Sequence, residues 1–343
     1  MRIAVVFDTP YSDWSPEKHA EQSARDHARG DDFEPDMEYQ VAKALVDSGH
    51  EVLLVGVHDD VRDATTRLAE WKPDLVFNAT ESFFENFDLD YLIPAMLESQ
   101  AYRYTGAPPL SLLVTRNKSM SKKILAYHGI NVPNFRTYRV GEKPRGETAL
   151  RFPIIVKPMG SDGSEGIARA SIVRDDRALA RRIAFLHKQF GKPAIAEEYI
   201  EGRELYLTMV GNGEKLQILP AVELVFAGGA SRAESRIQTK RMKWDLDYRK
   251  RHGIKTVYAR RMSKVAEERL EQVCRTAFRA LWLRDYARID VRLAKDDQIW
   301  FIEANANPYL SFGHNSAEAA HKAGMHYEAF IQRIVDEAMA RDA

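Results

Sequence analysis

The chain has 343 residues, of which 45% are hydrophobic and 29% are charged, a composition typical of a globular protein with two or three domains. Fifty Lys and Arg residues balance fifty Asp and Glu residues, so a broad electrostatic surface for nucleic acid or membrane is not expected. Its single cysteine, Cys274, cannot form an intrachain disulfide, and no stretch approaches the roughly 20 apolar residues of a membrane span. We therefore expect a cytoplasmic protein.

The first hundred residues alternate short apolar runs with helical patterns. Strands are predicted at 3–7, 52–57 and 75–78, and helices at 37–48 and 61–71. This alternation predicts a parallel α/β sheet of doubly wound type. The first strand is followed by Asp8 and not by a glycine fingerprint, so no dinucleotide site is predicted. The polar stretch 12–35 is predicted to be a long loop.

The remainder of the chain combines further strands with amphipathic helices. Apolar spacing predicts helices from about Thr115 to Gly129, from the N-cap Ser263 to Trp282, and over 327–339. Strands are predicted at 153–157, 194–199, 205–210, 286–293 and 299–305. The apolar stripes of the last two helices are interpreted as core.

Two of these strands predict a carboxylate site. If Asp296 and Asp297 form a two-residue hairpin loop, Asp290 lies opposite Glu303 and Arg288 lies opposite Asn305. Two close carboxylates repel unless a cation neutralises them, and Asp, Glu and Asn supply the oxygen ligands that magnesium prefers. The alternative is a solvated polar face on which Arg288 bridges the two acids.

A glycine-rich segment follows the strand at 153–157. Residues 157–166 contain three glycines and two serines, which expose backbone N–H groups to a phosphate, and Lys157 adds a positive charge. The segment is not a Walker sequence, and Ala168 to Ala170 is predicted to continue as a strand. The alternative is a flexible hairpin loop.

Taken together and in this order, these motifs resemble the ATP-grasp superfamily, and specifically its D-alanine–D-alanine ligase branch. The match runs from Asp74 to near Ala338 and includes Phe77-Asn-Ala and Tyr104-Thr-Gly. The resemblance implies an N-terminal Rossmann-like parallel α/β domain (1–112) followed by two α+β subdomains that clasp ATP. These are a central subdomain with the glycine-rich loop (113–195) and a C-terminal subdomain with the metal site (196–343).

The resemblance also implies residue roles. In the family pattern, Lys118 and Lys157 would contact adenine and the phosphates, and Glu197 and Glu204 would bind the nucleobase and the ribose. The whole nucleotide site comprises Lys118, Lys157, Gly160, Ser161, Gly163, Ser164, Gly166, Glu197, Glu198, Tyr199, Ile200 and Glu204. Two Mg²⁺ ions, or Mn²⁺ in their place, are held by Asp290, Glu303 and Asn305. Arg288 and the mobile-loop residue Lys243 are the catalytic residues.

The implied reaction is ATP-dependent ligation of two small molecules. ATP phosphorylates a substrate carboxylate, and an amine attacks the acyl phosphate to form an amide, with ADP released. The reaction needs no other macromolecule, and a homodimer is left open. The retained set Arg288, Asp290, Glu303 and Asn305 argues against the other class considered, a nucleotide-binding regulator without turnover.

The substrate pockets depart from the family pattern. Glu81-Ser82 replaces a His-Gly pair, Gly163 replaces a loop serine, Trp244 replaces a tyrosine, and Tyr309 replaces a glycine. The serine that holds the second substrate's carboxylate corresponds either to His314 or to Ser316, and Glu38 is the candidate for the first substrate's amino group. We therefore expect either a D-alanine–D-alanine ligase-like reaction or ligation of a different pair, such as a peptide or a non-proteinogenic acid.

Overall fold

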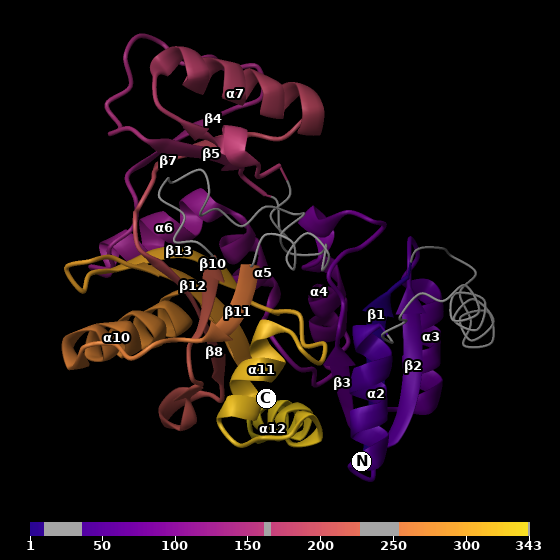
Figure 1. Cartoon of the computed structure of the whole chain (residues 1–343). Helices are drawn as coiled ribbons and strands as arrows, with labels where there is room; N and C mark the ends of the chain where they lie inside the picture. Colours follow the sequence, from indigo (N-terminus) through magenta and orange to yellow (C-terminus); the bar gives the residue numbers. More distant parts are fainter. Residues whose placement is uncertain (10–35, 161–165, 227–253, 342–343) are drawn as a thin grey trace, which may run out of the picture.

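The computed structural model describes residues 1–9, 36–160, 166–226 and 254–341. Three β-sheets follow one another along the chain. Figure 1 shows the second of them, with helix α7, as a lobe that projects from the rest of the molecule. The other two sheets form the body below this lobe, with the C-terminal helices between them.

The N-terminal sheet is parallel with strand order β2-β1-β3, as the alternation of strands and helices predicted. Its elements are β1 (Arg2–Asp8), α2 (Met37–Asp47), β2 (Glu51–Val57), α3 (Arg62–Trp71) and β3 (Leu75–Asn78). Alternate residues of β1 belong to different cores: Ile3 and Val5 pack in the cluster that contains α2, while Ala4 and Val6 pack in the cluster that contains α3. Both faces of the sheet are therefore covered, which explains the unbroken apolar run of its central strand.

The projecting lobe is an antiparallel sheet covered by one helix. Its order is β4-β7-β5-β6, built from β4 (Phe135–Tyr138), β5 (Ile154–Pro158), β6 (Ile172–Val173) and β7 (Ala194–Glu198), with α7 (Asp176–Phe190) against it. The strand predicted at Ala168–Ala170 is wrong. A 3₁₀ turn, Arg169–Ser171, occupies this position because the Ser171 N–H donates to Ala168 O, and the strand begins only at Ile172.

The C-terminal sheet is the largest. Its path is β11-β10-β8-β12-β13, with β9 paired to β8. The strands are β8 (Arg203–Val210), β9 (Gln217–Ile218), β10 (Val222–Phe226), β11 (Ile254–Tyr258), β12 (Tyr286–Leu293) and β13 (Ile299–Asn305). Helix α10 (Lys264–Ala280) packs against β12 and β13, and the predicted N-cap Ser263 accepts a hydrogen bond from the Ala266 N–H.

The helix predicted from Thr115 is two helices. Residue Asn117 lies between α5 (Pro109–Arg116) and α6 (Lys118–Tyr127), and its side chain accepts hydrogen bonds from the N–H groups of Ser119 and Met120. An asparagine at this position caps a new helix and ends the preceding one. Helix α6 packs against β13 and α10, so the segment that carries Lys118 reaches the C-terminal sheet. The predicted domain boundaries stay predictions.

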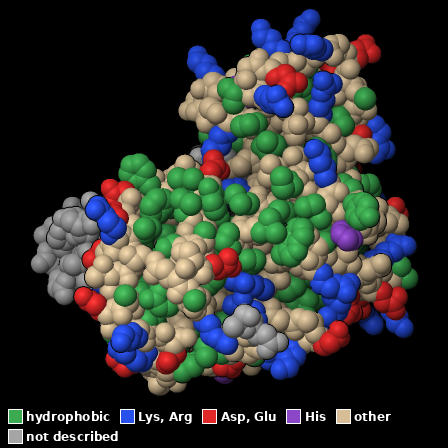
Figure 2. Space-filling model, turned by 180° about the vertical axis from the view of Figure 1, so that it is seen from behind, with side chains coloured by type: hydrophobic (Ala, Val, Ile, Leu, Met, Phe, Trp, Pro, Cys, Tyr) green, Lys and Arg blue, Asp and Glu red, His purple; other side chains and the backbone are tan. Residues whose placement is uncertain are grey.

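The two ends of the described chain pack together. Helix α12 (Tyr327–Ala340) lies against α2, as Figure 1 shows, and their apolar residues share one core cluster. Helix α4 (Leu92–Ser99), helix α11 (Asn315–Lys322) and the 3₁₀ turns Phe87–Leu89 and Gly213–Lys215 complete the described elements. Figure 2 shows hydrophobic side chains gathered on the rear face below the projecting lobe. The homodimer that the sequence analysis left open stays open.

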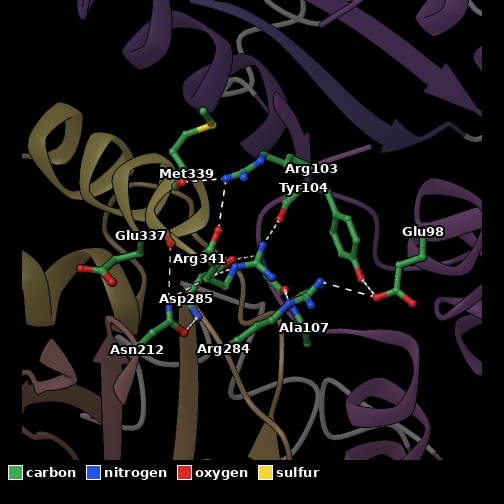
Figure 3. Close-up of polar contacts among 12 residues, drawn as sticks. Glu98, Arg103, Tyr104, Ala107, Asn212, Arg284, Asp285, Glu337, Met339 and Arg341 are labelled. Carbon is green, nitrogen blue, oxygen red and sulfur yellow. Dashed lines mark hydrogen bonds and ion pairs between the residues drawn. The ribbon is translucent and has the colours of Figure 1, made fainter. Parts of the chain in front are cut away.

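A polar network, buried at its centre, joins the segment after the N-terminal sheet, the C-terminal sheet and the end of helix α12 (Figure 3). At its centre is Asp285, which is 0% exposed. Its carboxylate accepts from the Gly106 N–H at 2.8 Å and from Asn212 Nδ2 at 3.0 Å, and it lies 2.9 Å from Arg341 Nε. Arg103 donates to the Met339 carbonyl oxygen at 2.7 Å. The end of the C-terminal helix is thus attached to the C-terminal sheet through the buried charge of Asp285 and to Arg103 through an exposed hydrogen bond, in addition to apolar packing.

We expect Asp285→Asn to destabilise the fold by about 3 kcal/mol, because breaking one partner of a buried ion pair leaves Arg341 without its counter-charge. Asparagine retains the side-chain shape and tolerates the left-handed backbone at this residue, where φ is 61°. Urea denaturation followed by circular dichroism measures the change. Lys264→Ala, in an exposed ion pair with Glu268, is the control and should shift stability by less than about 0.5 kcal/mol. Equal effects of the two variants would contradict this reading of Asp285.

Candidate active site

The strand pairing predicted for the carboxylate site is confirmed. Asp290 lies opposite Glu303, and Arg288 lies opposite Asn305. The side chains of Arg288 and Asp290 are buried, at 8% and 6% exposure, so a solvated polar face does not describe this part of the hairpin. The structure brings the three predicted metal-ligating residues and the predicted catalytic arginine together on adjacent strands.

The predicted hairpin loop, in contrast, is wrong. The Ala294 N–H donates to Gln298 O at 2.9 Å, so the loop runs from Lys295 to Asp297 instead of consisting of two aspartates. Asp297 adopts the left-handed φ of 59° that a three-residue hairpin loop needs. This loop displaces the pairing by one residue near the turn, and a β-bulge beside Asp290 restores it. The predicted site was correct because the two irregularities compensate.

Arg288 forms an ion pair with only one of the two acids. Its guanidinium donates to both Asp290 oxygens, at 2.7 and 3.0 Å, while the amide of Asn305 lies 3.4 Å from the same carboxylate. Burial raises the pKa of Asp290, and Arg288 opposes that rise. Arg288 therefore neutralises part of the negative charge of Asp290. The two hydrogen bonds also hold the guanidinium in one orientation.

Lysines on two other elements face the second acid. Lys118 Nζ, at the start of α6, lies 3.5 Å from Glu303 Oε2. Burial alone would raise the pKa of Glu303, but Lys118 and Lys157, helped by Arg288, lower it to about 2. Glu303 is thus an anion at neutral pH. Asp290, Glu303 and Asn305 offer an all-oxygen donor set beside bound positive charge, which fits Mg²⁺ and the phosphates that accompany it.

A buried residue that the sequence analysis did not single out completes the charge pattern. Lys122 is 0% exposed, and its Nζ lies 3.1 Å from Glu197 Oε1 and donates to the Ile302 carbonyl oxygen. Lys157 Nζ lies 3.0 Å from the other Glu197 oxygen. Burial lowers the pKa of Lys122 to about 8 although Glu197 raises it. Its position four residues after Lys118 places it on the same helix face, which is the signal that could have identified it.

The two neighbouring acids at the end of β7, Glu197 and Glu198, have different surroundings. Burial would raise the pKa of Glu197, but Lys122 and Lys157 hold it below its usual range. Glu198 points to the other face of β7, where Arg151 forms an ion pair with it at 2.8 Å. This alternation along the strand separates the two neighbouring glutamates, so only Glu197 faces the lysines.

Further along, Glu204 faces the metal site from β8. It accepts from Arg292 Nη2 at 2.6 Å and from the Tyr206 hydroxyl at 2.7 Å. The Arg292 guanidinium also lies 5.3 Å from the ring centroid of Tyr199. Glu204 is therefore tied to the strand that carries Asp290. The nucleotide-binding roles of Glu198, Tyr199, Ile200 and Glu204 stay predictions.

The glycine-rich segment is only partly described. Lys157, Gly160 and Gly166 lie within the described residues, whereas Ser161, Gly163, Ser164, Lys243 and Trp244 lie outside them. Gly166 has a φ of 68°, and a Cβ there would approach the Pro158 ring to 2.6 Å, so the segment ends at a position that admits only glycine. Lys157 begins the segment beside Glu197.

The predicted substrate residues that the structure describes lie on helix α2, just after strand β3 or in the segment after β13. Asp8, at the end of β1, accepts hydrogen bonds from the Glu81 N–H and the Ser82 hydroxyl, both at 2.7 Å. Burial raises the pKa of Glu38 to about 7, and the negative charges of Asp8 and Glu81 add to this effect. Burial, with Glu81 adding to it, also raises the pKa of Tyr309 to about 12.

His314 and Ser316 are in different environments. The His314 ring makes an edge contact with Tyr309, with ring centroids 4.9 Å apart. Ser316 is 0% exposed, and its hydroxyl accepts a hydrogen bond from Thr208 Oγ1 at 3.3 Å. Of the two residues left open by the sequence, His314 therefore has the more accessible side chain and lies beside Tyr309.

Within the described ranges, no group of three or more His, Cys, Asp or Glu side chains could hold a metal. The candidate metal centre consists instead of two acids and an amide, and its third ligand is Asn305. In the same part of the chain, no helix combines the length and apolar character needed to cross a membrane.

A family model described as D-ala D-ala ligase C-terminus matches residues 124–336. The chain belongs to this family. The family is one of ATP-dependent carboxylate–amine ligases, as the sequence resemblance implied. The uncharacterized protein y4sG of Sinorhizobium fredii is 33% identical over 309 residues, covering 88% of this chain and 87% of that protein. The D-alanine–D-alanine ligase of Desulforudis audaxviator is 27% identical, with 88% and 92% covered.

Solved structures confirm the ATP-grasp fold. The D-alanine–D-alanine ligase from Bacillus anthracis complexed with ATP has a TM-score of 0.71 at 22% identity and covers 99% of this chain and 97% of that one. The VanG D-Ala:D-Ser ligase from Enterococcus faecalis has a TM-score of 0.68 at 17% identity, with 98% and 99% covered. At these identities the likeness shows the shared fold.

We expect Lys122→Met to lower the free energy of unfolding by about 3–5 kcal/mol, because it removes one side of a buried ion pair and a donor to the Ile302 carbonyl. The matched control is Lys123→Met, the next residue on α6, whose side chain is exposed. Chemical denaturation of both variants decides the matter. A Lys122→Met protein as stable as the control would show that the ion pair between Lys122 and Glu197 does not stabilise the fold.

Proposed function

We propose that this ligase is ADP-forming and joins a small carboxylate to an amine through an acyl phosphate. A carboxylate oxygen of the first substrate attacks the γ-phosphorus of ATP, and ADP leaves. The amine of the second substrate then attacks the acyl carbon, phosphate leaves, and the amine loses a proton. The observation that carries this proposal is that buried Asp290 and half-buried Glu303 and Asn305 lie together beside Arg288.

The nucleotide would lie between the projecting lobe and the β12–β13 hairpin. Lys157 and Glu197 contribute from the lobe, and Lys118 and Glu303 from the body, so positive charge faces the space from both sides. We infer that Lys118 and Lys157 hold the phosphates, while Glu197 and Glu204 bind the nucleobase and ribose. Lys157 is already oriented by the buried carboxylate of Glu197 and Lys118 by the half-buried carboxylate of Glu303, which reduces the cost of ordering them on binding.

Asp290, Glu303 and Asn305 would hold two Mg²⁺ ions, or Mn²⁺. When bound, these ions supply charge neutralisation for the transferring phosphoryl group. Arg288, fixed by both Asp290 oxygens, would stabilise the acyl phosphate and the negative charge on the carbonyl oxygen during amine attack. Lys243 would add a further positive charge over the phosphates. Positioning and electrostatics of this kind provide most of what phosphoryl transfer requires.

The substrates would meet between the acidic edge of the N-terminal sheet and the loop after β13. Glu38 is our candidate for binding the amino group of the first substrate, with Glu81 close by. Tyr309 and His314 would border the amine-donating second substrate. D-alanine is named for relatives of this chain, but the altered residues Glu81, Gly163, Trp244 and Tyr309 favour a different pair, such as a peptide or a non-proteinogenic acid.

A screen over amino-acid pairs tests the reaction class through amine-dependent phosphate release from ATP and Mg²⁺. We expect Glu303→Gln to abolish this release, because it removes a metal-ligating charge, while leaving the chain folded. Nucleotide with Mg²⁺ should also raise the melting temperature of the wild type by linkage. Glu267→Gln, an exposed acid of α10, is the control and should keep wild-type turnover. Wild-type rates in Glu303→Gln would contradict the proposed metal site.

We expect D-alanine with D-alanine to be at best a poor substrate pair. Loss of a loop serine at Gly163 and of a tyrosine hydroxyl at Trp244 removes polar contacts, and a missing hydrogen-bond partner can change discrimination by orders of magnitude. Steady-state kinetics measure this directly. A kcat/KM for D-alanine of about 10⁴ M⁻¹s⁻¹ or more, in the ordinary range for enzymes, would disprove it.

A further inference from the structure

Helix α2 holds the loop that follows β13. The side-chain amide of Gln40 makes two hydrogen bonds to this loop: Nε2 donates to Ser311 Oγ at 2.7 Å, and Oε1 accepts from the Phe312 N–H at 2.7 Å. One turn earlier, Met37 Sδ accepts from the Leu310 N–H at 3.1 Å. Three consecutive loop residues, 310 to 312, are therefore bonded to side chains of one helix from the other end of the chain.

A second attachment fixes the beginning of the same loop. Asn307 Oδ1 accepts from the Ala107 N–H at 2.9 Å. Gly106 has a φ of 87°, and a Cβ there would lie 2.5 Å from the same oxygen, so glycine permits this close approach. The loop follows the last strand of the C-terminal sheet. Both of its attachments are nevertheless to the N-terminal third of the chain, namely to helix α2 and to Ala107.

Apolar packing does not hold the outer side of the loop in the same way. The Phe312 side chain is 61% exposed. A cavity of about 430 Å³ lies there, lined by residues that include Gln40, Lys43, Phe312 and Tyr327. On its inner side the loop is packed, since Leu310 and Ser311 are 1% and 3% exposed. Beside the cavity it is held by the bonds from Gln40 and by an edge contact between the rings of Phe312 and Tyr327.

The held residues lie between two predicted substrate residues. Tyr309 precedes them and His314 follows them, and their rings are in contact. Gln40 is also two residues after Glu38 on α2, so one helix carries the candidate ligand for the first substrate and the clamp for the second-substrate loop. A displacement of α2 would change both.

We propose that Gln40 is a positioning residue for the second substrate: by fixing residues 310–312 it orients Tyr309 and His314 toward the incoming amine. The inference rests on the proposed function, because it assumes that this loop borders the amine site. It assigns to Gln40 a role in amine specificity without contact with the reacting atoms. Binding of ATP, which we place between the projecting lobe and the β12–β13 hairpin, does not depend on it.

The first experiment needs no substrate. Gln40→Leu keeps the approximate size of the side chain and removes both hydrogen bonds, and amide hydrogen exchange of the full chain then reports on the loop. We expect exchange at the Phe312 amide to become at least about tenfold faster, equivalent to about 1.4 kcal/mol of lost protection. Lys43→Ala is the matched control, since Lys43 is on the same helix and lines the same cavity but bonds to Asp47. An unchanged exchange rate at the Phe312 amide in Gln40→Leu would overturn the inference that Gln40 holds residues 310–312 in place.

The second experiment uses the amino-acid pair that gives the fastest wild-type phosphate release in the screen. For Gln40→Leu we expect the KM of the amine-donating substrate to rise at least about tenfold, while the KM of ATP changes less than about twofold. Ser311→Ala removes the bond from Gln40 Nε2 and also the side-chain hydrogen bond between Ser311 and Tyr309, so it should likewise raise the amine KM and leave the KM of ATP nearly unchanged. A purely structural role would instead lower kcat and raise every KM together, and that result would overturn the inference.

The two proposals fail in different ways. A wild-type protein that releases no phosphate with any pair would overturn the proposed function, whatever the exchange data show. Normal wild-type turnover combined with an unchanged amine KM in Gln40→Leu would overturn only the role of Gln40.

Discussion

Carboxylates paired with lysines of helix α6 connect the parts of this protein. Glu197 on the projecting lobe is buried and Glu303 on the hairpin is half-buried, and α6 supplies a lysine to each of them. Because an unpaired buried charge costs several kcal/mol, the buried pair of Glu197 and Lys122 holds the lobe to α6, and Lys122 also donates to the hairpin at Ile302. The same charges form the surface on which we place the nucleotide, so one set of interactions both holds the fold and prepares the site.

The two acids of the candidate metal site have different counter-charges. Arg288 is bound to Asp290 through both carboxylate oxygens, which fixes its orientation and leaves Glu303 to the lysines of α6 and β5. A cation held by these acids would therefore have the arginine on one side and the lysines on the other. Such a preformed environment stabilises developing negative charge without reorganisation during the reaction.

The substrate region is formed by segments that are far apart in sequence. The acidic edge with Glu38 and Glu81 belongs to the N-terminal sheet, while Tyr309 and His314 follow the last strand of the C-terminal sheet. The polar network around Asp285 and the packing of α12 on α2 hold these parts together. Two of the departures from the family pattern, Glu81 and Tyr309, lie at this junction.

Local patterns predicted many of the elements and much of the site, but they missed β4, α7, β10 and β11 and did not separate α5 from α6. Buried strands such as 75–78, 286–293 and 299–305 are identifiable from apolar runs and alternation, and the pairing of Asp290 with Glu303 follows from the two-residue period of the strands. The hairpin loop could not be predicted, because a three-residue turn and a β-bulge have opposite effects on register and leave the same pairing at the site.

Contacts between distant segments were decided only by the tertiary structure. The residues around Lys122 in the sequence do not show that it is buried. It is buried against Glu197 because β7 and β13 approach helix α6. Likewise, Ser316 and His314 are two residues apart, but α11 turns Ser316 inward toward Thr208 and leaves His314 beside Tyr309. Gln40 gives no signal in sequence, because its partners Ser311 and Phe312 are about 270 residues away. Sequence determines which strands and charges are available, whereas burial, which depends on neighbours remote in the chain, determines which of them act together.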